Sequence, residues 1–186
     1  AAYAYPGTPS TEILQFLLNR AEQDGGPMAT WCANEKTAYE EALGVSMAGK
    51  RALVAMKHVG LNVAADPLMT LAYVGVKAGM VIITADDPSM FSSQNEQDNR
   101  YYAKLSGLPM VEPSSVTEAK DLLVYAFELS EKLQEPVLFR TTTRINPSPG
   151  TVTLGEIKPR KTKGNFQKDP LNLVVVPAVA RNLHVK

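Results

Sequence analysis

The chain has 186 residues, enough for one domain with an appendage and a substantial core. Lys and Arg together number 19, and so do Asp and Glu, so the near-zero net charge gives no general attraction to nucleic acid or anionic membranes. The single cysteine, Cys32, excludes an internal disulfide and any zinc or iron–sulfur site built from this chain's thiols alone. No apolar run approaches the roughly 20 residues needed to span a bilayer, so we expect a soluble, cytoplasmic protein.

Short apolar runs alternate with stretches of helical period, the pattern of βα units around a mostly parallel sheet. In the first third of the chain, strands are expected at 1–5, 28–32 and 52–56. A helix is predicted over 12–20, with Thr8 or Ser10 as its cap. A second helix is predicted over 34–48 and a loop over 57–62.

The remaining segments continue the alternation. Helices are predicted over 64–77, 99–105 and 116–133, the last with Ser115 and Glu118 at capping-box spacing, and strands at 80–85, 110–112 and 137–141. The fold class is therefore α/β, a doubly wound, mostly parallel sheet with helices on both faces. Composition changes at 146, so residues 1–145 are interpreted as one domain and 146–186 as an extended basic tail draped over, or linking to, another domain.

Four loops should carry the chemistry, because ligands of open α/β sheets bind beyond the carboxyl ends of the strands. They are YPGTPS, WCANE, MKHVGLN and ADDPSMFSSQNEQD, and each places polar residues directly after a buried strand. Their convergence would form a ligand cleft.

Glu35, in the second of these loops, has two interpretations. It can simply favour the positive N-terminal end of a helix that Asn34 caps. Alternatively, the apolar neighbours Trp31, Cys32 and Ala33 would partly desolvate its carboxyl, raise its pKa and suit it for proton exchange with a ring nitrogen.

Several segments together resemble one enzyme family. They are YPGTPSTEI, NEKTAYEEALGVSMAGKRALVAMKHVGLNVAADPLMTLAYVGVKAG, ADDPSMFSSQNEQDNRYYAKLSGLPMVEPSS and PVLFRTTTRINPS. The chain is similar over nearly its whole length to the amino-terminal part of the alpha subunit of indolepyruvate ferredoxin oxidoreductases, within the thiamine-diphosphate-dependent 2-oxoacid:ferredoxin oxidoreductases.

The resemblance implies a pyrimidine-binding domain of the thiamine-diphosphate fold. In such enzymes a glutamate, matched here by Glu35, hydrogen-bonds ring nitrogen N1′ and promotes the 4′-imino tautomer that removes the thiazolium C2 proton. The family's reaction oxidatively decarboxylates an aryl pyruvate such as indolepyruvate, delivers electrons through iron–sulfur clusters to ferredoxin, and passes the acyl group to coenzyme A. Mg²⁺ and [4Fe-4S] clusters are expected outside this chain, in an oligomer with further domains and a beta subunit, so the chain alone should be incompetent.

Three further residues become candidates through this resemblance or their position. Thr8 resembles a threonine that approaches the substrate carboxylate or the cofactor, although plain helix capping is an equal alternative. His58, just past a strand, could hydrogen-bond a carboxylate or transfer a proton, and Asn62 is a comparable cofactor-binding candidate. A structural or solvated role for both remains open.

The long polar loop departs from pyruvate-specific relatives, which carry an arginine near its start where this chain has Asp86 and Asp87. Acidic side chains would repel a substrate carboxylate, so either they point away or another subunit supplies positive charge. Ser92, Gln94 and Asn95 are then expected to shape the substrate pocket by hydrogen bonds, unless the loop is a solvated lid or subunit contact. A metal at the paired aspartates is not expected.

Two arginines near the end of the domain, Arg140 and Arg144, could face either the cofactor or a neighbouring subunit. Two rival interpretations of the whole chain are a non-catalytic module that positions a partner subunit, and a 2-oxoacid oxidoreductase of other substrate preference. A nicotinamide-dependent enzyme is disfavoured because no G-x-G-x-x-G follows a strand.

Overall fold

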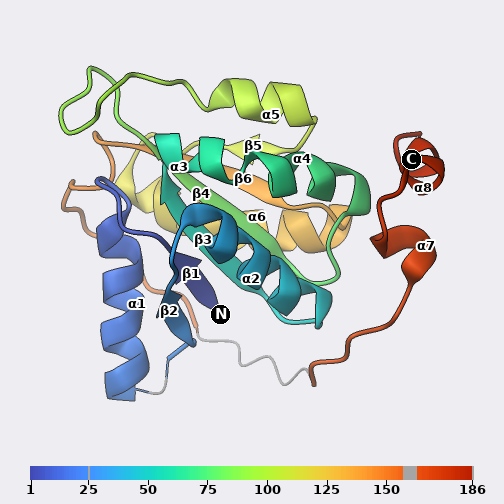
Figure 1. Cartoon of the computed structure of the whole chain (residues 1–186). Coiled ribbons are helices and arrows are strands. Elements are labelled where there is room, and N and C mark those ends of the chain that lie inside the picture. Colours follow the sequence, from blue (N-terminus) through green and yellow to red (C-terminus); the bar gives the residue numbers. More distant parts are fainter. Residues whose placement is uncertain (25, 157–162, 186) are drawn as a thin grey trace.

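The computed structural model describes residues 1–24, 26–156 and 163–185. Within them, parallel strands form a single six-stranded sheet in the order β2-β1-β3-β4-β6-β5 (Figure 1). The strands are β1 (Ala2–Ala4), β2 (Ala29–Trp31), β3 (Ala52–Lys57), β4 (Met80–Asp86), β5 (Met110–Val111) and β6 (Val137–Thr142). The predicted parallel α/β sheet is confirmed.

Helices cover both faces of this sheet. One face packs against α1 and α6, and the other against α2, α3, α4 and α5. The bounds are α1 (Thr11–Asp24), α2 (Glu35–Met47), α3 (His58–Val63), α4 (Ala65–Val74), α5 (Arg100–Ser106) and α6 (Val116–Leu133). The sheet is therefore doubly wound.

The central strands are buried on both sides because their side chains alternate between two cores. In β3, Val54 and Met56 join the core beneath α2 and α4, whereas Leu53 and Ala55 join the core beneath α1 and α6. This explains why these strands read as continuous apolar runs.

The segment predicted as a loop over 57–62 is instead the short helix α3, so that prediction was wrong. Gly60 and Asn62 made the segment look irregular, but Leu61 is fully buried in the core and its packing overrides the weak local propensity. The next helix ends earlier than predicted, at Val74, because Gly75 adopts a φ of 72°.

The described part of the tail contains two short helices, α7 (Pro170–Leu173) and α8 (Pro177–Leu183). The last of these lies against α4 of this same domain, with the rings of Tyr73 and His184 5.3 Å apart and Leu183 buried (Figure 1). The tail therefore packs on its own domain, while a boundary at 145 stays a prediction. Part of the basic run, 158–162, lies outside the described residues.

Among the described helices, none combines the length and the apolar character needed to cross a bilayer.

Candidate functional site

The strand order has a switch point between β1 and β3. After β1 the chain adds β2 on one side, and then crosses to add β3 on the other side of β1. Ligands of open α/β sheets bind at such a switch point. Here a Cβ built on Gly7, after β1, would lie 3.0 Å from the Cβ of Lys57, at the end of β3. The Lys57 ammonium donates to the carbonyl of Ser92 at 2.8 Å, and Asn146 donates to the carbonyl of Pro9 at 2.7 Å. The predicted convergence of loops is confirmed.

Glu35 opens α2 at this edge. The helix is capped by Asn34, whose side chain accepts from the Thr37 amide at 2.9 Å, so the Glu35 carboxyl is not needed as a cap. The Glu35 side chain is half-buried against α3: a Cβ on Gly60 would lie 2.6 Å from both its Cγ and its Oε1. No described residue donates a hydrogen bond to this carboxylate or forms an ion pair with it.

His58 is fully buried at the start of α3. Its Nε2 lies 3.2 Å from both the carbonyl oxygen and the Oδ1 of Asn95. Two acceptors at this distance favour the tautomer with hydrogen on Nε2. Nδ1 is then a buried acceptor with no hydrogen-bond partner among the described residues.

The backbone of α3 is fastened to the loop that follows β4. The carbonyl of His58 accepts from Asn99 Nδ2 at 3.1 Å and from Gln97 Nε2 at 3.2 Å. Asn99 Nδ2 also donates to Thr84 Oγ1 at 2.6 Å. These bonds fix the position of α3 relative to the sheet, and therefore the position of Gly60 beside Glu35.

Asn62 is exposed on the same helix, and its amide is already engaged. It exchanges hydrogen bonds of 2.9 Å with Gln97 in both directions and accepts from the hydroxyl of Tyr102 at 2.7 Å. Its predicted contact with a cofactor stays a prediction, since what the structure shows is a brace between α3 and α5.

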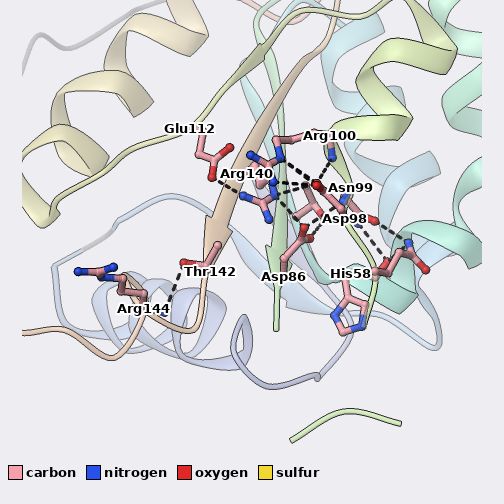
Figure 2. A network of polar contacts seen from close by, with 11 residues as sticks. His58, Asp86, Asp98, Asn99, Arg100, Glu112, Arg140, Thr142 and Arg144 are labelled. Atoms are coloured by element: carbon pink, nitrogen blue, oxygen red, sulfur yellow. Dashed lines mark hydrogen bonds and ion pairs between the residues drawn. The ribbon is translucent and has the colours of Figure 1, made fainter. Parts of the chain in front are cut away.

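Buried charges lie behind this loop. Arg140 on β6 donates from Nε to Asp86 at 2.8 Å, with both side chains almost completely buried (Figure 2). Its Nη1 bonds Glu112, and Asp98 lies 3.7 Å away, itself paired with Arg100. Burial raises the pKa of Asp86 despite the opposing hydrogen bonds from the Asn99 amide and Arg140. Arg140 is therefore engaged by carboxylates of β4 and of the segments around β5 and α5, and links the sheet to the loop.

Asp87 organises the loop from inside. Its carboxylate accepts from the amides of Phe91 and Ser92 at 3.2 and 2.8 Å and from the hydroxyl of Ser93 at 2.5 Å. Desolvation raises the pKa of this carboxyl, but the hydrogen bonds from Ser93, Ser92 and Phe91 together lower it below its usual value.

The same loop holds a strained backbone, with φ of 67° at Ser89 and 56° at Met90. Each such residue costs on the order of 1–3 kcal/mol and persists only where its surroundings over-determine it, as the Asp87 hydrogen bonds do here. The two aspartates thus point inward, which confirms the first of the two alternatives for them. Among the described residues no cluster of His, Cys, Asp and Glu is arranged to hold a metal ion.

The other predicted substrate residues fall in two places. Thr8 and Ser92 line a cavity of about 590 Å³, together with Arg144, which lies apart from the buried charges (Figure 2). Neither predicted cap accepts a hydrogen bond from an α1 amide among the described residues: the Ser10 hydroxyl donates to the carbonyl of Gly7, and Thr8 lies three residues before the helix begins. Asn95 contacts His58, away from this cavity, and Gln94 is exposed.

Sequence-based prediction missed Gln97, Asn99 and the pairing of Asp86 with Arg140. One signal was available: Arg140 stands inside an apolar strand, and a charge buried there requires an opposite charge close by. Asn99 gave no such signal, because its contacts depend on the tertiary position of α3.

Comparison with known proteins places this geometry in a family. Residues 1–156 match the family described as "Pyruvate flavodoxin/ferredoxin oxidoreductase, thiamine diP-bdg". Indolepyruvate oxidoreductase subunit IorA of Pyrococcus horikoshii is 53% identical over 97% of this chain and 28% of its own length, and IorA of Archaeoglobus fulgidus is 52% identical over 97% and 30%. The chain thus spans less than a third of these relatives.

A solved structure shares the fold at lower identity. It is the 2-oxoglutarate:ferredoxin oxidoreductase from Magnetococcus marinus, 21% identical, with a TM-score of 0.67 over 76% of this chain and 26% of that one. The switch-point site, the family match and the relatives agree: the chain belongs to the thiamine-diphosphate-binding domain family of the pyruvate flavodoxin/ferredoxin oxidoreductases.

Proposed function

We propose that this chain holds the aminopyrimidine ring of thiamine diphosphate, with Glu35 hydrogen-bonded to ring nitrogen N1′. The observation that carries the proposal is the half-buried Glu35 carboxyl, set against Gly60 beside the switch point and left without a donor among the described residues. A bare backbone at Gly60 lets α3 approach that carboxyl closely. The residues present therefore fit the pyrimidine end of the cofactor.

Each side chain then has a definite task. Thiamine diphosphate, when bound, would supply a carbon acid that, once it has given up its proton, can add to a keto group. Glu35 would hold or share a proton with N1′, and its half-buried position would strengthen that hydrogen bond by limiting access of water. Asn62 supports the cofactor-binding face through its brace to Gln97 and Tyr102.

His58 is proposed as the second catalytic group. Asn95 fixes its Nε2 hydrogen, which leaves the Nδ1 lone pair to accept a proton or a hydrogen bond from a bound group. Thr8, Ser92 and Gln94 are assigned to the substrate side of the site, Thr8 and Ser92 through the cavity that they line.

The complete enzyme is proposed to decarboxylate aryl pyruvates such as indolepyruvate oxidatively, forming acyl-CoA with ferredoxin as electron acceptor. Support comes from relatives about half identical to this chain that bear the name indolepyruvate oxidoreductase. Mg²⁺, [4Fe-4S] clusters and the diphosphate site are assigned to other domains of the alpha subunit and to the beta subunit, in a cytoplasmic oligomer. The rival is a non-catalytic module that only positions a partner subunit.

Glu35→Gln in the complete enzyme separates the two. We expect turnover to fall by roughly 10²-fold or more, the usual scale for removing a general acid–base group, with folding intact. Glu40→Gln, on an exposed turn of the same helix, is the matched control and should leave turnover unchanged. Wild-type turnover in Glu35→Gln would exclude the proposed role of Glu35, and the non-catalytic interaction module would be the remaining interpretation.

A further inference from the structure

The cavity that contains Thr8 lies among three carboxyl-edge segments. Its walls come from the loop after β1, the loop after β4 and the segment after β6: Thr8, Pro9, Glu12, Phe91, Ser92, Thr143, Arg144, Asn146 and Pro147. Its volume of about 590 Å³ is within the range of small-molecule sites. The Asn146 bond to the Pro9 carbonyl ties two of these walls together.

Arg144 gives the cavity a positive group. Its guanidinium has no carboxylate within ion-pair distance among the described residues, in contrast to Arg140. Lys57 adds a second positive charge nearby through its bond to the Ser92 carbonyl. The acidic side chain on this wall is Glu12, whereas Asp86 and Asp87 are turned inward and engaged.

Phe91 gives the cavity an aromatic surface. Its side chain is 81% exposed, which is unfavourable for an isolated phenyl ring in water. The conformation is imposed, since Asp87 accepts from the Phe91 amide while the two preceding residues have positive φ. A loop built to present a ring next to an unpaired guanidinium suits a ligand that is both aromatic and anionic.

We propose that this cavity is the substrate subsite for an aryl 2-oxo acid, with Arg144 binding the carboxylate and Phe91 contacting the aromatic ring. Thr8 and Ser92 then lie within the same walls to hydrogen-bond the polar end of the substrate. A planar guanidinium can bind a carboxylate through two parallel hydrogen bonds, which also fixes its orientation. The inference rests on the proposed function, and it assigns the specificity of that site to two residues.

The test uses the complete enzyme and steady-state kinetics with indolepyruvate, phenylpyruvate and pyruvate. Arg144→Met should raise KM for all three about 10- to 100-fold, because each loses its charge-assisted contact, with kcat changed less than about threefold. Arg144→Lys should recover part of the loss. Phe91→Ala should raise KM about tenfold for the two aryl substrates and less than about twofold for pyruvate.

Matched controls are Arg181→Met and Phe16→Ala, which remove the same side chains from exposed positions outside this cavity. Unchanged KM in Arg144→Met, an equal effect of Phe91→Ala on aryl and alkyl substrates, or a rise in KM for coenzyme A alone would each overturn the inference. Half-saturation by thiamine diphosphate, measured in the same variants, should stay at the wild-type value. If Glu35→Gln is inactive while Arg144→Met has wild-type kinetics, only the proposed substrate subsite is contradicted. Wild-type kinetics in both variants would contradict the proposed function as well.

Discussion

Gly60 of α3 faces the side chain of Glu35 so closely that there is no room for a Cβ between them. The added atom would lie 2.6 Å from Glu35 Cγ and 2.9 Å from its Cδ, well inside contact distance. The observed position of the Glu35 carboxyl therefore requires a residue without a side chain at position 60.

Gly60→Ala should therefore displace Glu35 and lower turnover about tenfold or more, although alanine favours a helix by up to about 1 kcal/mol. Thermal unfolding and turnover should be measured together. Gly44→Ala on α2 is the control, since a Cβ there meets nothing within 4 Å, and it should leave turnover unchanged. Full activity in Gly60→Ala would mean that the Glu35 position is not critical.

Breaking the buried ion pair should cost far more than breaking an exposed one. Arg140→Met leaves the buried Asp86 carboxyl without its counter-charge, and should lower the free energy of unfolding by about 3–5 kcal/mol. Adding Asp86→Asn should restore part of that loss, which urea unfolding of the single and double variants will show. Arg100→Met, which breaks the exposed pair with Asp98, should lower the free energy of unfolding far less, because solvent screens that pair. Additive effects of Arg140→Met and Asp86→Asn would contradict the pairing.

Asp87→Ala should release the loop after β4. The amides of Phe91 and Ser92 lose their acceptor, so their hydrogen exchange should accelerate by about tenfold or more. Because the pKa of Asp87 is lowered, the wild-type protein should protect these two amides from hydrogen exchange at neutral pH. This protection should be lost as the pH falls below the usual pKa range of the carboxyl. Asp121→Ala, at an exposed position, is the control. Unchanged exchange would show that the strained loop does not depend on Asp87.

Glu135 predicts a pH dependence of stability. Desolvation raises its pKa to about 7 from 4.5, and its Oε2 is buried without a partner among the described residues. A raised carboxyl pKa means that its stabilising contribution is complete below about pH 4.5 and is lost as pH rises through about 7. After allowance for partial exposure, the loss should be about 1–2 kcal/mol between pH 5 and 8, and Glu135→Gln should remove it.

His184 lines the same cavity as Glu135, so His184→Asn is the required control for that slope. If Glu135→Gln keeps the wild-type slope and His184→Asn abolishes it, the assignment to Glu135 is wrong.

The 186-residue chain alone should bind thiamine diphosphate weakly. The described residues offer Glu35 to the pyrimidine ring but no cluster for the metal that neutralises the diphosphate. Isothermal titration calorimetry with and without Mg²⁺ tests this, and tight magnesium-dependent binding would contradict the division of the site between domains.

Local signals predicted the elements well where one residue type decides the structure. The caps at Asn34 and Ser115 and the apolar run of β4 were read correctly from the sequence. The position of Arg140 in an apolar strand indicates that it needs an acidic partner, but the sequence does not identify that partner as Asp86. The two residues meet only through the pairing of β4 with β6, and β5 lies between these strands in chain order. The helical state of α3 was missed because burial of Leu61 outweighs local propensity.

The two outermost strands of the sheet are short, three residues in β2 and two in β5. So few unpaired backbone groups give another chain little to extend by strand addition, and this also limits edge-to-edge aggregation. In the proposed enzyme, further domains should therefore contact this one through side chains of the loops at the carboxyl ends of the strands and of the helical layers, and not by continuing the sheet.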